Sequence, residues 1–109
     1  DSNTLDSILS LKVHAYSSSA VTSLKGSQTL FVIVQDQNLR PVPGAQVVFS
    51  VSLPGGKLER YVSPLTDEHG ISQFNFRFDS ASLGSANIKV EATYAGLHTD
   101  TVTSFRIWW

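Results

Sequence analysis

Residues 36–51 read DQNLRPVPGAQVVFSV, a polar turn with two prolines between two apolar runs. Pro41 and Pro43 have a fixed φ and no backbone N–H, and Gly44 tolerates backbone angles that other residues avoid. The chain therefore reverses direction here and does not continue as a helix. The apolar runs on either side of the turn predict two strands of a β-sandwich.

Apolar and polar residues alternate along most of the chain, the pattern of half-buried β-strands. The expected strands cover about 9–16, 28–35, 45–53, 58–62, 71–79 and 85–94, followed by a last strand that ends at 105–109. Residues 17–26 are expected to form a loop. About seven strands in 109 residues predict one all-β domain, residues 1–109. The expected fold is an immunoglobulin-like β-sandwich of two antiparallel sheets with Greek-key connections.

Several packing expectations follow from the phase of the alternation. Leu9, Leu11, Val13 and Ala15 are expected to face inward, and Phe74, Phe76 and Phe78 to form the centre of the core. Residues 28–35 are apolar on both faces, so Phe31 and Ile33 should be covered by loops of the chain or by a partner. Between Val102 and Phe105 the phase shifts, which predicts a β-bulge near 103–104.

An odd number of alternating strands has a consequence for the ends of the chain. If the strands run alternately up and down, the first begins at one pole of the domain and the seventh ends at the other. The two termini are therefore expected at opposite ends, as in a module that can be joined into a rod.

Composition excludes several classes of function. The net charge is −1, and the eight Lys and Arg residues are scattered along the chain, so no nucleic-acid-binding or membrane-binding patch is expected. The longest apolar run, Leu30–Val34, is far shorter than the roughly 20 residues of a membrane-spanning helix. Cysteine is absent, which excludes disulfides, thiolate metal sites and thiol nucleophiles.

No pattern of residues predicts catalysis. A hydrolytic site needs a nucleophile, a base and an orienting acid in one pocket, and no Gly-x-Ser-x-Gly motif occurs in the sequence. His14 is expected at an exposed position of the first strand, and His69 and His98 are expected in turns. We therefore expect a protein that is not an enzyme and needs no cofactor.

The acidic turns offer one candidate metal site. Three turns should meet at one pole and bring oxygen ligands together there, which is the chemistry that calcium prefers. The residues concerned are Asp36, Asn38, Asp67 and Glu68, with His69 and His98 nearby. The alternative, which we favour, is that these Asp and Asn side chains bind nearby backbone amides and stabilise the turns, so no metal ligands are assigned.

Aromatic residues offer a candidate binding surface. Trp108, Trp109, Tyr61 and Tyr94, together with Tyr16, could stack against sugar rings or pack against a partner. The alternative is a packing role, in which Phe105, Ile107 and Trp109 face the core while Arg106 and Trp108 point outward. Adjacent residues of a strand face opposite sides, which argues against one flat platform of both tryptophans.

Four segments carry a resemblance to a known family. Residues 36–49 follow the pattern Asp-x-x-Gly-x-Pro-Val-x-Gly-x-x-Val-x-Phe, with Leu39 in place of the first glycine. Pro54–Leu58, Thr66–Gly70 and Gly84–Thr93 follow in the matching order. In these segments the chain resembles the bacterial immunoglobulin-like domains of group 1, the repeats of invasin-type and intimin-type adhesins. Residues 66–74 are also similar to macroglobulin-type and carboxypeptidase regulatory-like sandwiches, which share the architecture without sharing a role.

The resemblance implies a non-catalytic module of a larger bacterial protein that is extracellular or attached to the cell surface. Such a module serves as a spacer or as an interaction domain, and its expected partners are neighbouring domains and a surface receptor. A second hypothesis from another class is an ancillary carbohydrate-binding module attached to a polysaccharide-acting enzyme. The aromatic residues named above would then be its contacts.

Overall fold

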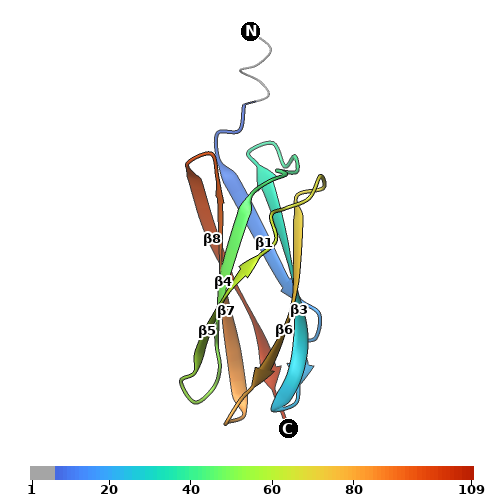
Figure 1. Cartoon of the computed structure of the whole chain (residues 1–109), viewed down its shortest axis with the longest axis vertical. Helices are drawn as coiled ribbons and strands as arrows, with labels where there is room; N and C mark the ends of the chain where they lie inside the picture. The colour runs from blue at the N-terminus through green and yellow to red at the C-terminus, as the bar shows by residue number, and fades with distance from the viewer. Residues whose placement is uncertain (1–6) are drawn as a thin grey trace.

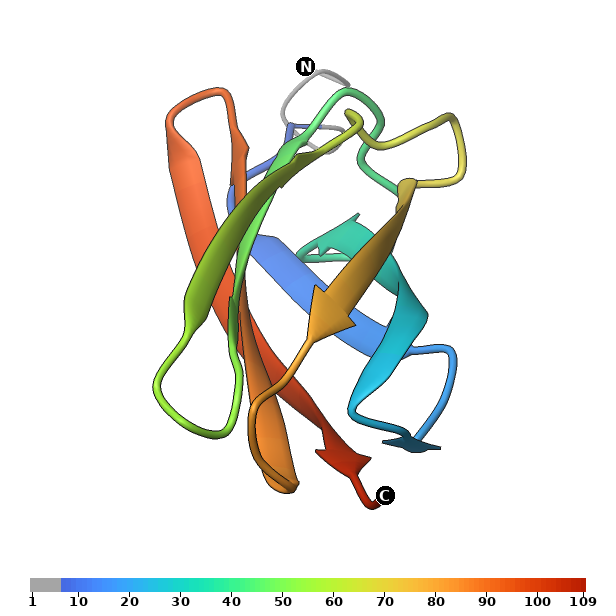
Figure 2. The same cartoon turned by 60° about the horizontal axis from the view of Figure 1, so that its bottom comes forward.

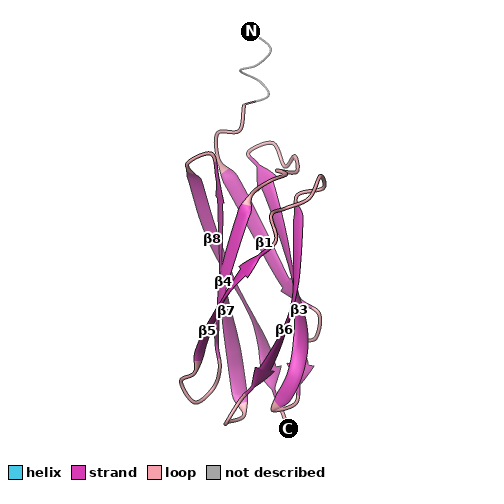
Figure 3. Ribbon diagram, viewed as in Figure 1, coloured by secondary structure: helices cyan, strands magenta, loops and turns pink. Residues whose placement is uncertain are grey.

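The computed structural model describes residues 7–109, and within this range it contains strands, turns and loops but no helix (Figures 1 and 3). The strands are β1 (Leu11–Ser17), β2 (Val21–Thr22), β3 (Lys25–Asp36), β4 (Gln46–Ser52), β5 (Leu58–Ser63), β6 (Ile71–Asp79), β7 (Gly84–Tyr94) and β8 (Leu97–Ile107). The all-β prediction is therefore confirmed.

The strands form two sheets that lie face to face (Figure 2). One sheet has the order β1-β3-β6 and the other the order β2-β8-β7-β4-β5. Neighbouring strands are antiparallel, except that β2 pairs with β8 in parallel. The result is a sandwich-like β-fold elongated along its strands.

The core consists of the inward-facing rows of both sheets, as the alternation predicted. Inward residues of β3, β4 and β7 are at most 1% exposed: Leu30, Val32, Val34, Val47, Phe49, Val51, Ala86, Ile88, Val90 and Ala92. Phe76 of β6 meets Phe49 of β4 across the core, with ring centroids 5.6 Å apart. Burial of these rows supplies the main driving force for folding.

The three phenylalanines of β6 are not equally buried. Phe76 and Phe78 are buried, whereas Phe74 is half-buried. Phe74 lies at the margin of the core, where its ring centroid is 5.5 Å from those of both Phe49 and Tyr61. Two of the three phenylalanines expected at the centre of the core are therefore buried there, and the third lies at its margin.

The segment expected to be a loop between the first two strands contains β2. Its two residues pair with Arg106 and Ile107 of β8. Two residues are too few to show an alternation of apolar and polar side chains, and the partner strand lies near the other end of the sequence. The sequence pattern therefore could not predict β2. Residues 7–109 therefore contain seven longer strands, as expected, and one short parallel strand that was not expected.

The β-bulge predicted near 103–104 is wrong. The ladder between β7 and β8 runs without interruption from the pair Gly84–Ile107 to the pair Tyr94–Leu97. Val102 points outward and is 73% exposed, whereas its neighbours Thr101 and Thr103 are half-buried. The apparent phase shift arose because threonines occupy the inward positions of this part of β8.

Two further packing predictions need correction. Leu9 precedes β1 and is 67% exposed, so the inward row of the first strand begins at Leu11. Phe31 and Ile33 lie on the outer face of their sheet, where no third layer covers them among residues 7–109, so the expected cover by loops of the chain is wrong, whereas cover by a partner stays a prediction. They are half-buried beside their cross-strand neighbours, which for Phe31 include Tyr16.

The described chain enters the sandwich at one pole and leaves it at the other, as expected. β1 begins at the upper end of Figure 1 and the chain ends at Trp109 at the lower end. We call these ends the upper pole and the lower pole. No helix among residues 7–109 is long and apolar enough to cross a membrane.

Candidate functional site

The upper pole gathers the three connections that were expected to meet there: residues 37–45, residues 64–70 and the turn at 95–96 (Figure 1). Asp36 lies at the start of the first connection and is only 3% exposed. Its Oδ1 atom accepts hydrogen bonds from the backbone N–H of Asn38 (2.8 Å) and of Arg40 (3.0 Å). The bond from Arg40 is the main cause that lowers the pKa of Asp36.

Asp67 organises the second connection in the same way. Its Oδ1 atom accepts hydrogen bonds from the backbone N–H of His69 (2.8 Å) and of Ile71 (3.0 Å). These two bonds, that of Ile71 first, lower the pKa of Asp67. Each aspartate therefore stabilises its own turn, the interpretation that the sequence favoured.

The calcium candidates do not form a ligand cage. Asp36 and Asp67 each direct one oxygen to two amides, while Asn38 and Glu68 are exposed. Within residues 7–109 no three His, Asp or Glu side chains come together as metal ligands would. His69 lies in a turn as expected, but His98 is the second residue of β8, so its expected place in a turn is wrong.

The sequence did not identify Thr66 as the residue that connects the loops of the upper pole. Its buried Oγ1 accepts a hydrogen bond from Ala45 N–H (2.8 Å) and donates one to Val42 C=O (2.6 Å). Its backbone N–H donates to Ala45 C=O (3.0 Å), and Gly44 N–H donates to Thr66 C=O (2.9 Å). Four bonds thus join the two connections into one rigid unit.

Gly70 lies at the closest backbone approach of this pole. Its φ is +74°, and a Cβ placed there would lie 2.5 Å from Val34 O and 3.0 Å from Val42 N. The approach is held by hydrogen bonds from Val34 N–H to Gly70 C=O (2.8 Å) and from Val42 N–H to Val34 C=O (3.0 Å). A residue with a side chain does not fit without displacing the backbone.

The tryptophans lie at the lower pole, where both are exposed, Trp108 at 61% and Trp109 at 63%. Phe105 and Ile107 are buried and Arg106 and Trp108 point outward, as expected, but Trp109 does not face the core. The Arg106 guanidinium lies 5.2 Å from the centre of the Trp108 ring, within the range of a cation–π contact. This pair of side chains is the candidate contact at the lower pole.

The two candidate tyrosines are elsewhere. Tyr61 is half-buried and stacks on Phe49 with ring centroids 5.1 Å apart. Its hydroxyl donates to Glu59 (3.3 Å), and burial is the main cause that raises the pKa of Tyr61. Tyr94 is half-buried at the upper pole, beside Gly44. The structure therefore does not bring the four candidate aromatic residues together on one platform.

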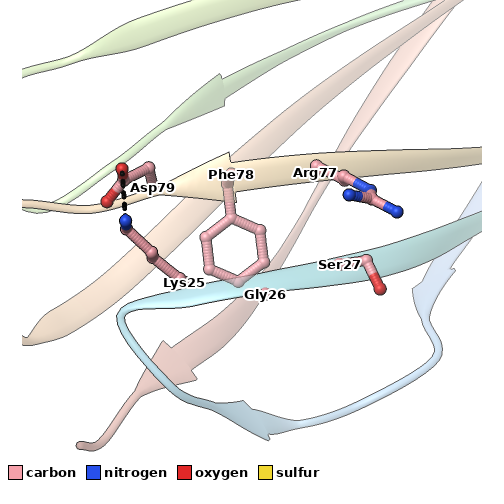
Figure 4. Close-up of a pocket in the computed structure, with 6 residues that line it drawn as sticks. All are labelled: Lys25, Gly26, Ser27, Arg77, Phe78 and Asp79. Carbon is pink, nitrogen blue, oxygen red and sulfur yellow. Dashed lines mark ion pairs between the residues drawn. The ribbon is translucent and has the colours of Figure 1, made fainter.

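An open groove of about 440 Å³ lies where β3 begins and β6 ends (Figure 4). It is lined by Lys25, Gly26, Ser27, Arg77, Phe78 and Asp79. A second depression of about 230 Å³ is lined by Lys57 and Glu59 and by three residues that also line the groove, Arg77, Phe78 and Asp79. In the groove Gly26 of β3 lies opposite Phe78 of β6, a pairing that no pattern within either strand reveals.

The groove presents mixed charges to solvent. Lys25 Nζ lies 3.8 Å from Asp79 Oδ2, and both side chains are largely exposed. An exposed ion pair of this kind contributes little to stability. With cations and anions side by side, the groove has no clear preference for ligands of one charge.

Comparison with models of protein families gives no match, and comparison with curated protein sequences gives no significant match. The resemblance to group 1 bacterial immunoglobulin-like domains therefore rests on the four sequence segments described above.

Proposed function

We propose that this protein is a non-catalytic immunoglobulin-like module that acts as a spacer or interaction domain of a larger secreted or cell-surface bacterial protein. The observation that carries the proposal is the exit of the chain at the pole opposite to its entry (Figure 1). Modules joined through opposite poles add their lengths, whereas modules with both ends at one pole form side branches.

The path of the chain supports the immunoglobulin-like part of the proposal. Besides the two crossings on either side of β2, the chain crosses from one sheet to the other between β3 and β4, between β5 and β6 and between β6 and β7. β7 then returns to pair with β4, and β6 pairs with β3. Crossings of this kind characterise Greek-key sandwiches of the immunoglobulin type.

The construction of the upper pole supports an interaction role beside the spacer role. Asp36, Asp67 and Thr66 hold the loops by hydrogen bonds to the backbone, which leaves the tips of these loops exposed on a rigid base. Loops positioned by a rigid scaffold are the usual place of contacts with partners.

The spacer role is tested by measuring length. Two and three copies of the chain, fused directly, are compared with one copy by small-angle X-ray scattering. Each copy should add about 40 Å to the maximum dimension, because its longest strand, β3, has 12 residues that rise about 3.3 Å each. A control with long Gly-Ser linkers separates a stiff rod from a flexible string. Fused copies that fold side by side without lengthening would contradict the spacer role.

A second candidate is an ancillary carbohydrate-binding module, favoured by the exposed Trp108 and Trp109 and by Arg106 beside Trp108. Pull-down with insoluble polysaccharides tests it with Trp108→Ala and Trp109→Ala, and with Tyr94→Ala at the other pole as a control. Retention that either tryptophan variant loses and the control keeps would favour sugar binding. Absence of the parent chain from every pellet would favour the spacer.

A further inference from the structure

We propose that the free edge of β5 is a docking site for an extended peptide segment of another protein, in which an acidic residue lies between two aliphatic ones. Such a segment pairs with β5 as an added strand of the five-stranded sheet. The inference goes beyond the proposed spacer role, because it concerns the side of the sandwich and not its two poles.

β5 ends the order of its sheet, and among residues 7–109 only β4 pairs with it (Figure 1). The hydrogen bond from Leu53 N–H to Lys57 C=O (2.8 Å) begins this antiparallel ladder. In such a ladder every second residue bonds to the neighbouring strand, and the residues between them direct their backbone groups away from it. Counted from Lys57, the residues that face the free edge are Leu58, Arg60 and Val62.

The backbone groups of this edge are accessible. No hydrogen bond from another part of residues 7–109 reaches the N–H or C=O of Leu58, Arg60 or Val62. All three side chains are exposed on the outer face of the sheet, Leu58 at 65% and Val62 at 63%. An open strand edge of this kind is a template for another extended backbone.

The other strand edges are less open. At β6, Ile71 N–H donates to the Asp67 carboxylate (3.0 Å) and Ile71 C=O accepts from Asp67 N–H (2.9 Å). Farther along β6, the Tyr61 hydroxyl lies 3.5 Å from Arg77 C=O. β1 lies against β8, and β2 pairs with the end of β8. A partner strand therefore reaches β5 most directly.

Charge determines which kind of segment fits the edge. Arg60 forms no ion pair within residues 7–109, whereas Lys89 of the same sheet lies 3.7 Å from Glu91. An acidic side chain opposite Arg60 therefore gains a cross-strand partner that the chain itself does not supply. Aliphatic side chains two residues to either side of it contact Leu58 and Val62.

A second copy of this chain fits the edge less well. If two β5 strands pair antiparallel about a two-fold axis with all three edge residues matched, Arg60 of one copy lies opposite Arg60 of the other. Like charges directly opposite each other destabilise a ladder. Arg60 thus disfavours self-association and favours an acidic partner.

Peptide titration of the single domain, followed by the NMR signals of its backbone amides, tests the site. The probe is the capped peptide Thr-Val-Thr-Glu-Thr-Val-Thr, and the control peptide has Lys in place of Glu. The amides of Leu58, Arg60 and Val62 should shift, and the Glu peptide should bind about fivefold more tightly than the Lys peptide. Arg60→Glu should reverse this preference.

Two further changes separate strand pairing from simple charge attraction. Arg60→Pro removes an N–H that faces the free edge and takes no part in the ladder with β4, so the domain should fold and lose peptide binding. A Glu peptide methylated on the backbone nitrogen of its Glu should also lose binding. This second test needs no change in the protein, so it decides even if Arg60→Pro does not fold.

The outcomes are distinct. Unshifted amides at all three edge residues, equal binding of the Glu and Lys peptides, or undiminished binding of the methylated peptide would overturn the proposal. Dimerisation of the parent chain in analytical ultracentrifugation that Arg60→Pro abolishes would also overturn it, because a second copy would then occupy the edge. The spacer role is judged separately, by whether fused copies lengthen.

Discussion

Replacement of Gly70 by alanine is the most direct test of how the upper pole is built. A Cβ at this position would lie 2.5 Å from Val34 O, a distance that real Cβ atoms essentially never show. The backbone at residue 70 and that of β3 would have to move apart by roughly 0.9 Å before the Cβ reached ordinary contact, which begins at 3.4 Å. That movement weakens the two backbone hydrogen bonds in which Val34 takes part, one with Gly70 and one with Val42.

The expected cost of Gly70→Ala is the sum of two effects. The left-handed backbone conformation costs a residue with a Cβ about 1 to 2 kcal/mol. Two weakened hydrogen bonds add about 2 kcal/mol at about 1 kcal/mol each. We therefore expect Gly70→Ala to lower the free energy of unfolding by about 3 to 4 kcal/mol.

Gly96→Ala is the matched control, because its φ of +81° is similar to that of Gly70 but nothing lies within 4 Å of the added Cβ. It should show only the conformational cost of about 1 to 2 kcal/mol. Urea denaturation followed by tryptophan fluorescence measures both variants under the same conditions. Equal losses of stability in Gly70→Ala and Gly96→Ala would refute the close approach as the reason for glycine at position 70.

Four other predictions concern the core, the turns and metal ions. Phe76→Ala should cost about 3 to 5 kcal/mol in urea denaturation, and Phe74→Ala less, because Phe74 is half-buried at the rim; equal costs would contradict this assignment. Ala95 lies in the turn between β7 and β8 with a φ of +50°, a conformation that asparagine adopts more readily than alanine. Ala95→Asn should therefore stabilise the protein and raise its melting temperature. The pKa values of Asp36 and Asp67 are lowered in the folded state, so their contribution to stability is present above the unfolded pKa near 3.8 and is lost as pH falls through the folded value. The double variant Asp36→Asn, Asp67→Asn keeps the acceptor oxygens but cannot titrate, so its free energy of unfolding should fall less than that of the parent as the pH is lowered. An equal fall in both proteins would show that these two carboxylates do not cause the acid destabilisation. Calcium or a chelator should leave the melting temperature of the parent chain unchanged, and a rise with calcium would reveal a native-state site.

Interpretation of the candidate site from sequence succeeded where the chemistry is local. Asp36 and Asp67 bind amides two and four residues further along the chain, and a short turn motif is enough to predict such bonds. Interpretation failed where partners are distant in sequence. Thr66 bonds to Val42 and Ala45, and Gln28 to Ser18 and Ser19 of another connection, so neither role is encoded in a short motif.

The β-strand pattern was readable because side chains of a strand alternate between two faces, and the residues themselves record which face is buried. The same property explains the failures. Threonine fits both faces, so Thr101 and Thr103 suggested a bulge in a ladder that is regular. Leu9 is apolar but exposed, and nothing in the local sequence shows that it lies before the start of β1.

The sequence by itself determined that this chain forms strands rather than helices, where most of these strands begin and end, and which residues turn inward. Only the tertiary structure decided which strand edges meet. It placed β2 beside the end of β8, brought Gly70 against Val34, and separated Tyr94 from the tryptophans by the length of the molecule (Figure 1). The reason is physical: alternation and turn preferences depend on a residue and its near neighbours, whereas pairing depends on contacts between segments that meet only after both sheets have formed.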